Sequence, residues 1–264
     1  MAYYYETHLH TCQGSACGAS TGAEHARRYK ELGYQGVIVT DHFFGGNTAV
    51  PRTLLSWEER IELFCQGYED AKAEGDRIGL DVFFGLEQNF RGDEYLIYGL
   101  DKAYLMAHPE MEHWTRREML EEVHKGGGCV IQAHPFRNRD YIQKILLCHQ
   151  FCDGIEAANA GNYLHNDAAA YRYAKEFGLP MTAGSDNHSV EWTRKHEDVI
   201  MGVALDQPLT CIQDYVQLIL HHGPIGLKVP QGRFDLDPDY PDLETYWLDE
   251  DEQPYPTHRS WLKD

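Results

Sequence analysis

Basic residues are scarce in this chain. Among its 264 residues, 42 are aspartate or glutamate and only 23 are lysine or arginine, so the formal net charge at pH 7 is −19. A field of this sign repels the phosphates of nucleic acids, which argues against general nucleic-acid affinity unless metals or a local basic patch reverse it. Acidic residues recur between Asp235 and Glu252 with no basic residue among them, a run typical of a solvated surface.

Long apolar runs and the marks of secretion are also missing. No apolar run approaches the length that a transmembrane helix needs, which predicts no membrane partner. The start, Met-Ala-Tyr-Tyr-Tyr, lacks the charged and then apolar pattern of a signal peptide. The seven cysteines are an odd and scattered set without the spacing of a disulfide scaffold. These features together predict a cytoplasmic protein with reduced thiols.

One pattern repeats along the chain: an amphipathic stretch, a small turn, and a short apolar run that ends in a polar residue. The pattern predicts helices over 22–32, 57–74, 116–124, 140–151 and 167–177, and strands over 3–9, 37–39, 81–86, 129–133, 154–157 and 181–184. Helices that alternate with short strands indicate βα units around a parallel sheet, as a barrel or as a doubly wound sheet.

No linker rich in proline, glycine or serine divides the chain. From about Gly223 onward the periodicity fails, and proline and acidic residues dominate. We therefore predict one α/β domain over residues 1–222 and a C-terminal extension over residues 223–264. The extension is expected to pack on the surface of the domain or to contribute a loop near its site.

Seven histidines and carboxylates lie near or directly after the ends of the predicted strands. They are His8, His10, His42, Glu87, His134, Asp186 and His188. The carboxyl ends of parallel barrel strands converge on one face, so side chains that are distant in sequence meet there. Because strand side chains alternate, His8 and His10 point to the same side and can bind one ion together.

Imidazoles and carboxylates are ligands for Zn, Mn or Fe. Seven candidates are too many for one tetrahedral ion, so we expect two or three divalent metal ions, with a carboxylate such as Glu87 bridging two of them. Paired metals roughly 3.5–4 Å apart generate a hydroxide nucleophile and stabilise the attacking and leaving oxygens of an in-line displacement. One such histidine alone is more often structural, but the joint placement favours phosphate-ester hydrolysis.

Six short segments between about residues 6 and 190 add a second pattern. They are Thr7-His8-Leu9-His10-Thr11, Ser15-Ala16-Cys17-Gly18, Val39-Thr40-Asp41-His42, Gly85-Leu86-Glu87, Ala133-His134-Pro135 and Gly184-Ser185-Asp186-Asn187-His188. In their order, spacing and placement at strand ends, they resemble the PHP family, the polymerase-and-histidinol-phosphatase type of metal-dependent phosphoesterase. The resemblance implies a distorted (β/α)7 barrel with up to three metal ions.

The resemblance also implies a ligand set. By position, it gives His8, His10, Glu87 and Asp186 to a first metal, Glu87 with His134 to a second, and His42 with His188 to a third. The chain departs from the family near Cys17 and at Glu94-Tyr95, where many members have a further ligand. Cys17 is then a soft ligand or a buried turn thiol. Glu94 is an oxygen ligand, or Tyr95 fills the place without binding.

A phosphate substrate requires a cation beside the metals. Arg91 and Arg137 lie on loops expected at the same face, where a guanidinium can bind phosphate oxygens in a bidentate manner, although surface arginines are common. Asp41 is expected to orient a ligand. The histidines without strand-end placement are expected to be solvated, with a proton shuttle as the alternative for one of them, His196; they are His165, His196, His221 and His222.

The sequence thus predicts a metal-dependent phosphoesterase that hydrolyses a small phosphomonoester, a metabolite or nucleotide, by means of a metal-bound hydroxide. An amidohydrolase-like C–N hydrolase is one alternative, but such enzymes often bridge their metals with a carbamylated lysine, and no predicted strand ends in lysine. A non-catalytic barrel that binds a metal or a phosphorylated ligand is another. Substrate specificity is expected in the loops 43–55 and 136–140 and in the C-terminal segment, and no oligomeric state is predicted.

Overall fold

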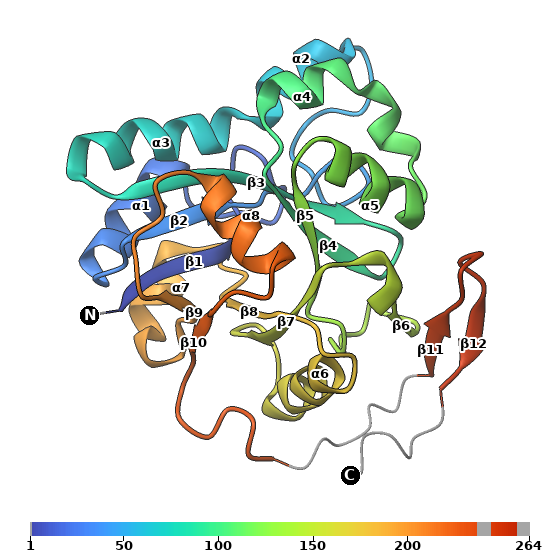
Figure 1. The fold of residues 1–264 in the computed structure, drawn as a ribbon. Helices are drawn as coiled ribbons and strands as arrows, with labels where there is room; N and C mark the ends of the chain where they lie inside the picture. Colours follow the sequence, from blue (N-terminus) through green and yellow to red (C-terminus); the bar gives the residue numbers. More distant parts are fainter. Residues whose placement is uncertain (1, 237–243, 258–264) are drawn as a thin grey trace.

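A mixed sheet of nine strands curls into a nearly closed barrel with helices around its outside (Figure 1). The computed structural model describes residues 2–236 and 244–257. In spatial order the strands are β10 (Gly226–Lys228), β9 (Gly202–Leu205), β1 (Tyr3–Leu9), β2 (Gly36–Val39), β3 (Asp81–Asn89), β4 (Glu94–Tyr98), β5 (Cys129–Ala133), β7 (Gly154–Asn159) and β8 (Met181–Gly184). A parallel bridge between Leu9 and Asn187 joins the two sides of the barrel next to β8. The barrel predicted from the sequence is confirmed.

Several helices begin at capping residues that can be recognised in the sequence. They are α1 (Gly22–Glu31), α2 (Trp57–Phe64), α3 (Gln66–Ile78), α4 (Lys102–Ala107), α5 (Arg116–Lys125), α6 (Leu164–Glu176), α7 (Val190–Lys195) and α8 (Ile212–Leu220), with 3-10 turns η1 (Pro109–His113), η2 (His149–Phe151) and η3 (Glu197–Val199). Capping boxes begin α1, α2 and α5, each with a Thr or Ser and a Glu three residues later. Each box satisfies two backbone amides that the helix leaves free. No helix among the described residues is long and apolar enough to cross a membrane.

The alternating pattern suggested a parallel sheet, but the observed sheet is mixed. Strands β1, β2 and β3 run parallel to one another, as do β5, β7 and β8, but β4 is antiparallel to both of its neighbours. The turn between β3 and β4 explains the reversal. Arg91 and Gly92 adopt positive φ there, and the amide of Phe90 donates to the carbonyl of Asp93. So short a connection joins antiparallel strands only.

Two predicted elements differ from those observed. The helix expected over 57–74 is two helices, α2 and α3, which meet at Cys65. The helix expected over 140–151 is wrong, because this stretch forms strand β6 (Ile145–Leu147) and the turn η2. Strand β6 pairs in parallel with β11 (Thr245–Leu248), a partner about a hundred residues away that local periodicity does not reveal.

The predicted extension enters two sheets. Strand β10 lies at one edge of the nine-stranded sheet, whereas β11 and β12 (Pro254–Pro256) form a hairpin that adds to β6 (Figure 1). Residues 237–243 and 258–264 of the extension lie outside the described residues. The division at residue 222 stays a prediction.

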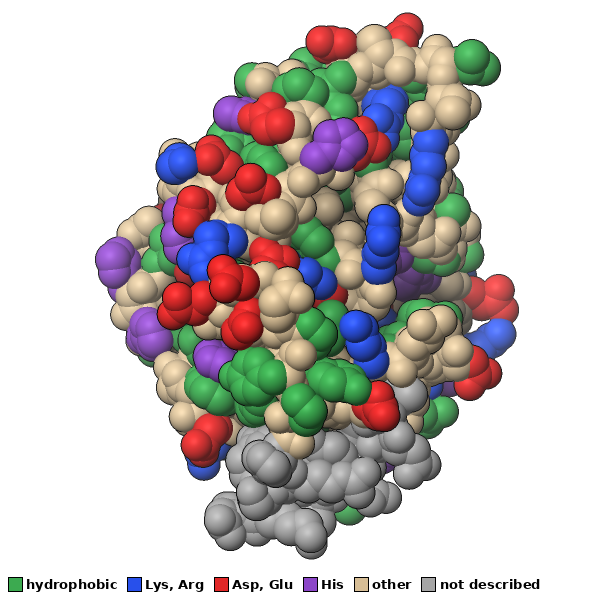
Figure 2. All heavy atoms as spheres, turned by 90° about the vertical axis from the view of Figure 1, so that its right-hand side faces the viewer, with side chains coloured by type: hydrophobic (Ala, Val, Ile, Leu, Met, Phe, Trp, Pro, Cys, Tyr) green, Lys and Arg blue, Asp and Glu red, His purple; other side chains and the backbone are tan. Residues whose placement is uncertain are grey.

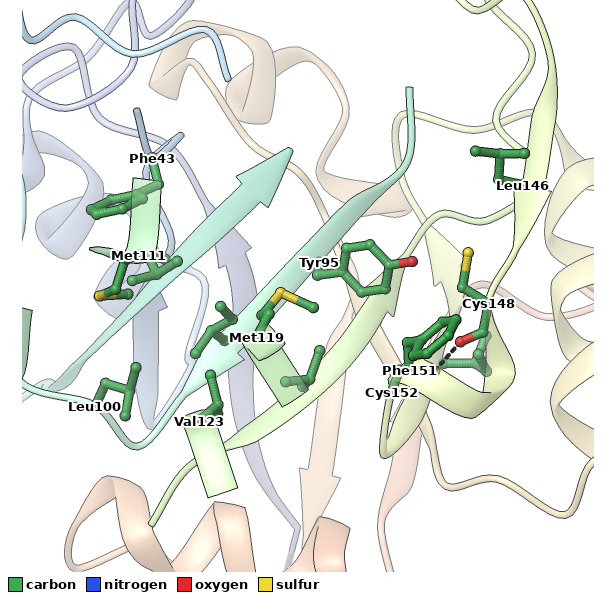
Figure 3. Close-up of a cluster of buried hydrophobic side chains, with 14 of the residues drawn as sticks. Phe43, Tyr95, Leu100, Met111, Met119, Val123, Leu146, Cys148, Phe151 and Cys152 are labelled. Atoms are coloured by element: carbon green, nitrogen blue, oxygen red, sulfur yellow. Dashed lines mark hydrogen bonds between the residues drawn. The ribbon is translucent and has the colours of Figure 1, made fainter. Parts of the chain in front are cut away.

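A large hydrophobic core fills the space between the sheet and the helices outside it. In Figure 3, Tyr95 from β4 lies with Met119 and Val123 of α5 on one side and Cys148 and Phe151 on the other. All five side chains are buried. Since strand side chains alternate, Tyr95 in this core requires its neighbours Glu94 and Leu96 to point to the opposite, inner side of the sheet.

Helix α3 approaches the loop after β1 at a glycine. A Cβ on Gly67 would lie closer than 3.0 Å to Thr11 Oγ1 and to Asp41 Oδ2, two atoms joined by a buried hydrogen bond of 2.7 Å. The bare backbone of Gly67 therefore lets the helix close over this polar pair.

Substitution Gly67→Ala should destabilise the protein by about 1–3 kcal/mol, because the added methyl group overpacks this contact. Helix propensity alone would give the opposite sign, a gain of roughly 0.5–1 kcal/mol. Urea unfolding of Gly67→Ala and of Ala73→Gly, an exposed site on the same helix, separates the two effects. A more stable Gly67→Ala protein would contradict the packing described here.

Candidate metal centre

All seven predicted ligands meet at the end of the barrel where β1, β2, β3, β5 and β8 finish. Three donor atoms are close together: His8 Nε2 and His10 Nε2 lie 3.0 Å apart, and Asp186 Oδ1 lies 3.5 Å and 3.1 Å from them. The carboxylate of Glu87 lies beside them, with Oε1 3.2 Å from His8 Nε2 and Oε2 3.5 Å from His10 Nε2. Ligands about 2.0–2.1 Å from a tetrahedral zinc ion lie roughly 3.3–3.4 Å from one another, which is the spacing found here.

Two buried atoms of the cluster point into a shared space without a hydrogen bond. Neither His42 Nδ1 nor Glu87 Oε2 has a hydrogen-bond partner of normal geometry among the described residues, although the two atoms lie only 2.6 Å apart. Buried polar atoms without partners are costly, and a cation between these two would satisfy both. Together with the four converging donors, this arrangement fits a divalent metal ion.

The other candidate ligands surround Glu87. His134 Nε2 lies 3.3 Å from Glu87 Oε1, and 3.5 Å from Glu94 Oε2 on its other side. His42 and His188 form a group with His10 whose ligand atoms lie within 4.8 Å of one another. Among the described residues the donors form four overlapping groups, two of which contain Glu87.

The electrostatics of the cluster keep its donors ready for a cation. Burial and the imidazoles of His188 and His42 lower the pKa of His10 well below its usual value. Burial opposes the charged forms of Glu87 and Asp186, but their cationic neighbours, His8 foremost for Glu87 and Arg137 for Asp186, hold both pKa values well below the usual range. An uncharged His10 and ionised carboxylates are the forms that bind metal.

His8 behaves differently, because carboxylates surround it. Burial disfavours its charged form, but Glu156 and Asp186 outweigh burial and raise the pKa of His8 well above its usual value. A metal ion would take the place of the positive charge that this cage of carboxylates favours.

Glu156, in the middle of β7, was not predicted from the sequence. It is fully buried, and its Oε1 lies 3.0 Å from His8 Nδ1, while its Oε2 accepts hydrogen bonds from the amide of His134 and the side chain of Asn159. A proton on His8 Nδ1 leaves Nε2 free to face the other donors. A charged residue in the buried strand 154–157 was the available signal, since such a group is buried only with partners.

Asp41 has the position expected of a residue that orients a ligand. Its Oδ1 accepts a hydrogen bond of 2.7 Å from Ser15 Oγ, and Ser15 Oγ lies 3.1 Å from His10 Nδ1. Because the single hydroxyl proton of Ser15 goes to Asp41, Ser15 must accept the proton of His10 Nδ1, which leaves His10 Nε2 free for a metal. Burial raises the pKa of Asp41 to about 6, so the carboxylate is ionised at neutral pH.

Backbone strain accompanies two of the candidate ligands. His134 and Asp186 adopt φ values of 29° and 50°, in a region that residues other than glycine rarely occupy. Such strain persists only where surrounding contacts enforce it, and it clusters at functional sites.

The two predicted phosphate-binding arginines have different environments. Arg137 is buried and donates to Asp186 Oδ2 at 2.6 Å, and it lines a pocket of about 320 Å³ with Asp186, His188, Arg139 and Trp192. Arg91 is exposed in the β3–β4 turn, where its backbone amide donates to Asn89. The structure brings Arg137 beside the cluster and does not bring Arg91 into contact with it.

Figure 2 shows one face of the molecule on which several basic side chains form a broken column, so the net negative charge is not spread evenly.

A buried polar network behind Arg137 was also missed. Asn159 and Asn162 accept hydrogen bonds from Arg137, and both pack against Arg233, which donates to their backbone carbonyls and to Asp167 Oδ2 at 2.6 Å. Arg233 is only 6% exposed, although it comes from the C-terminal segment. No local motif marks it, because its partners are about 70 residues away in the sequence.

The remaining candidates are placed as follows. The Cys17 thiol is exposed and contacts His188 and His42; burial opposes its ionisation, but these imidazoles lower its pKa to about 6. His196 is exposed and stacks on Trp192, and the pair His221 and His222 is exposed directly after α8. His165 stacks on Tyr163. None of these four histidines belongs to the donor groups found among the described residues.

Part of this site matches known sequences. The family model described as PHP-associated covers residues 165–191, from α6 through β8 to Asp186 and His188. A 5'-3' exoribonuclease of Haemophilus influenzae is 34% identical over 74 residues. That match covers 26% of this chain and 27% of the Haemophilus enzyme, so the similarity spans little more than a quarter of that relative.

Three solved structures share the fold. A two-domain protein of Bacteroides vulgatus with a predicted PHP-like metal-dependent phosphoesterase aligns with a TM-score of 0.64 and 14% identity, over 87% of this chain and 65% of its own. A proposed metal-dependent phosphoesterase of Bifidobacterium adolescentis gives 0.54 and 16%, over 83% and 96%. An amidohydrolase of Chromobacterium violaceum, solved with bound sulfate, gives 0.52 and 16%, over 81% and 96%. The chain spans less than two thirds of the Bacteroides protein, and identities this low show a common fold alone.

Substitution Glu156→Gln should weaken metal binding by about 10–100-fold, because an amide has one acceptor oxygen where Glu156 uses two, and the orientation of His8 is lost. Calorimetric titration of metal-free protein with Zn²⁺ measures the change. Glu176→Gln, an exposed site on α6, is the matched control. Equal affinities of the Glu156→Gln and wild-type proteins would show that Glu156 does not orient His8.

Substitution Arg233→Met should destabilise the protein by about 3–5 kcal/mol at pH 8, because it leaves the Asp167 carboxylate buried without its cation. The loss of stability caused by Arg233→Met should be smaller at pH 5. Burial already raises the pKa of Asp167 to about 6, and removal of Arg233 raises it further, so the carboxyl is protonated at pH 5 in both folded proteins and ionised at pH 8 in the wild type.

Urea unfolding at the two pH values gives the free energies of unfolding for this comparison. Arg77→Met, which removes an exposed pair with Glu74, should change stability little at either pH. A loss for Arg233→Met that is as large at pH 5 as at pH 8 would contradict the role given to the Asp167 carboxylate.

Proposed function

We propose that the chain is a PHP family protein and a metal-dependent phosphoesterase that hydrolyses a small phosphomonoester; its fold and the match over residues 165–191 support the assignment. The observation that carries the proposal is the cluster of converging donors, with the buried cation Arg137 paired to one of them, Asp186, in a pocket that both residues line.

The residues proposed to hold the metals are those of the donor groups. As the resemblance implies, the first position would use His8, His10, Glu87 and Asp186, the second Glu87 with His134, and the third His42 with His188, and the short distances between these side chains support the assignment. Divalent cations bound there would supply an acidified water and positive charge for the transferred phosphoryl group. The metals are proposed to be two or three ions of Mn, Fe or Zn.

The chain's own residues bind and orient the substrate in this proposal. Arg137 binds Asn162, Asn159 and Asp186 through Nε and Nη2, which fixes its guanidinium beside the cluster, and its Nη1 is proposed to donate to a phosphate oxygen. The pocket beside it extends past Arg139 to Trp192, which leaves room for the organic part of the ester. Arg139 comes from the loop 136–140 that we expect to set specificity.

Hydrolysis of C–N bonds is the second candidate function, since one structural neighbour is an amidohydrolase. Against it, a glutamate, Glu87, lies among the donors where such enzymes often have a carbamylated lysine. The exoribonuclease relative makes nucleotides and short RNA necessary members of any substrate panel. All seven cysteines are free, which suits the reducing cytoplasm that we propose for the protein.

The deciding experiment measures phosphate release from monoesters, diesters, nucleotides and short RNA, with amides as the competing class. Metal-free protein is supplied with Mn²⁺, Zn²⁺ or Fe²⁺, and a chelator serves as the blank. We expect metal-dependent release from a monoester. The double variant His8→Ala/His10→Ala should lose roughly 10³-fold or more in activity, since metal catalysis supplies several kcal/mol, and should bind less metal.

The exposed pair provides the matched control, because His221→Ala/His222→Ala also removes two imidazoles but none from the donor groups. Circular dichroism verifies that both double variants are folded. If the folded, metal-loaded protein hydrolyses an amide and releases no phosphate, the result would reject the phosphoesterase proposal and support C–N hydrolysis. Full activity of His8→Ala/His10→Ala would reject the metal site.

A further inference from the structure

The reversed strand β4 brings a second glutamate to the metal end of the barrel. Because β4 runs against β3 and β5, its first residue lies where its neighbours have their last ones. Glu94 is directly opposite Asn89 on one side and Ala133 on the other, the residue before His134. Tyr95 points the other way, into the core, where its hydroxyl donates to Asp93 at 2.7 Å (Figure 3).

The carboxylate of Glu94 is held with one oxygen toward the cluster. Asn89 Nδ2 donates to Glu94 Oε1 at 2.8 Å, which leaves Oε2 3.5 Å from His134 Nε2. Glu94 also forms a group with His42 and Glu87 whose ligand atoms lie within 4.8 Å of one another. Its side chain is 14% exposed, so it faces the cluster at the rim.

The turn that carries Glu94 is rigidly anchored. Arg116 of α5 forms a bidentate ion pair with Asp93, with distances of 2.7 Å and 2.6 Å, and its guanidinium lies over the ring of Phe90. Glu94 is therefore placed from both ends, by this ion pair before it and by the strand pairing after it.

The negative charge of the carboxylates around His134 favours a bound cation. Two carboxylates, Glu87 and Glu94, lie within 3.5 Å of its Nε2, and the nearby guanidinium of Arg137 is already paired with Asp186. Oxygen-rich positions of this kind suit Mn²⁺ and Mg²⁺.

The second oxygen of Glu87 faces different donors. Its Oε2 lies 2.6 Å from His42 Nδ1 and 3.5 Å from His10 Nε2, and these two histidines form a group with His188. Nitrogen donors suit Zn²⁺ better than they suit Mn²⁺. The two sides of one bridging carboxylate thus differ in chemical hardness.

We propose that Glu94 is a metal ligand, and that it makes the position shared with Glu87 and His134 selective for a hard divalent cation, Mn²⁺ in preference to Zn²⁺. The imidazole-rich position takes Zn²⁺, so the centre holds two kinds of metal. This inference rests on the proposed metal-dependent function and deepens it, because it assigns an ion to each side of Glu87.

The test is direct metal binding, without substrate. Metal-free full-length protein is titrated with Mn²⁺, and free Mn²⁺ is read from its electron paramagnetic resonance signal, first alone and then with one equivalent of Zn²⁺ present. We expect Mn²⁺ to bind the wild-type protein in the presence of that Zn²⁺. Since changes behind a ligand already cost about 10–100-fold in affinity, Glu94→Gln should weaken Mn²⁺ binding by roughly 100-fold or more while Zn²⁺ binding is retained.

Two further variants make the result specific. Glu94→Asp keeps a carboxylate and should retain a preference for Mn²⁺, whereas Glu94→His should shift the competition toward Zn²⁺ by about tenfold or more. Glu121→Gln, an exposed site on α5, should bind both metals as the wild type does. Thermal melting verifies that each variant is folded.

The outcomes separate this inference from the proposed function. Wild-type Mn²⁺ affinity in folded Glu94→Gln, or an equal loss of Mn²⁺ and Zn²⁺, would overturn it. Mn²⁺ binding that depends on Glu94 in a protein that releases no phosphate would support the inference and refute the phosphoesterase proposal. Phosphate release by a protein whose Mn²⁺ binding does not depend on Glu94 would refute the inference and support the phosphoesterase proposal.

Discussion

The concentration of buried negative charge at one end of the barrel constrains the rest of the structure. Glu87, Asp186, Glu156 and Asp41 are all largely or fully buried, against one neighbouring guanidinium, that of Arg137. Burying ionised carboxylates is costly unless each is hydrogen-bonded or paired with a cation. The hydroxyls of Thr11 and Ser15 donate to Asp41, and the side-chain amide of Asn159 and the backbone amide of His134 donate to Glu156. Divalent metal ions would supply the remaining charge.

The barrel and its donor cluster could be predicted because both follow from short-range patterns. Alternating elements predict a barrel or a doubly wound sheet, and the rule that parallel strands converge at their carboxyl ends groups His42, His134 and Asp186 with the HxH pair. The same rule has no place for Glu94, because a reversed strand presents its first residue at that end. The predicted strand over 81–86 likewise ended before Glu87, which lies inside β3 since β4 prolongs the pairing.

The features that the sequence did not reveal depend on contacts across long stretches of chain. The Ile145–Leu147 run was predicted as helix because its partner β11 is nearly a hundred residues away. Glu156 and Arg233 have no motif of their own, and their roles come from the side chains they meet, His8 for the first and Asp167 for the second. Arg137 and Arg91 were equivalent in the sequence, and only the fold separates a buried guanidinium from an exposed one.

The network around Arg233 has a consequence for the order in which the protein is made. A ribosome synthesises every candidate ligand up to His188 before it reaches residue 233, and domains fold as the chain emerges. The asparagines that hold Arg137 therefore gain the support of Arg233 only after every candidate ligand has been synthesised.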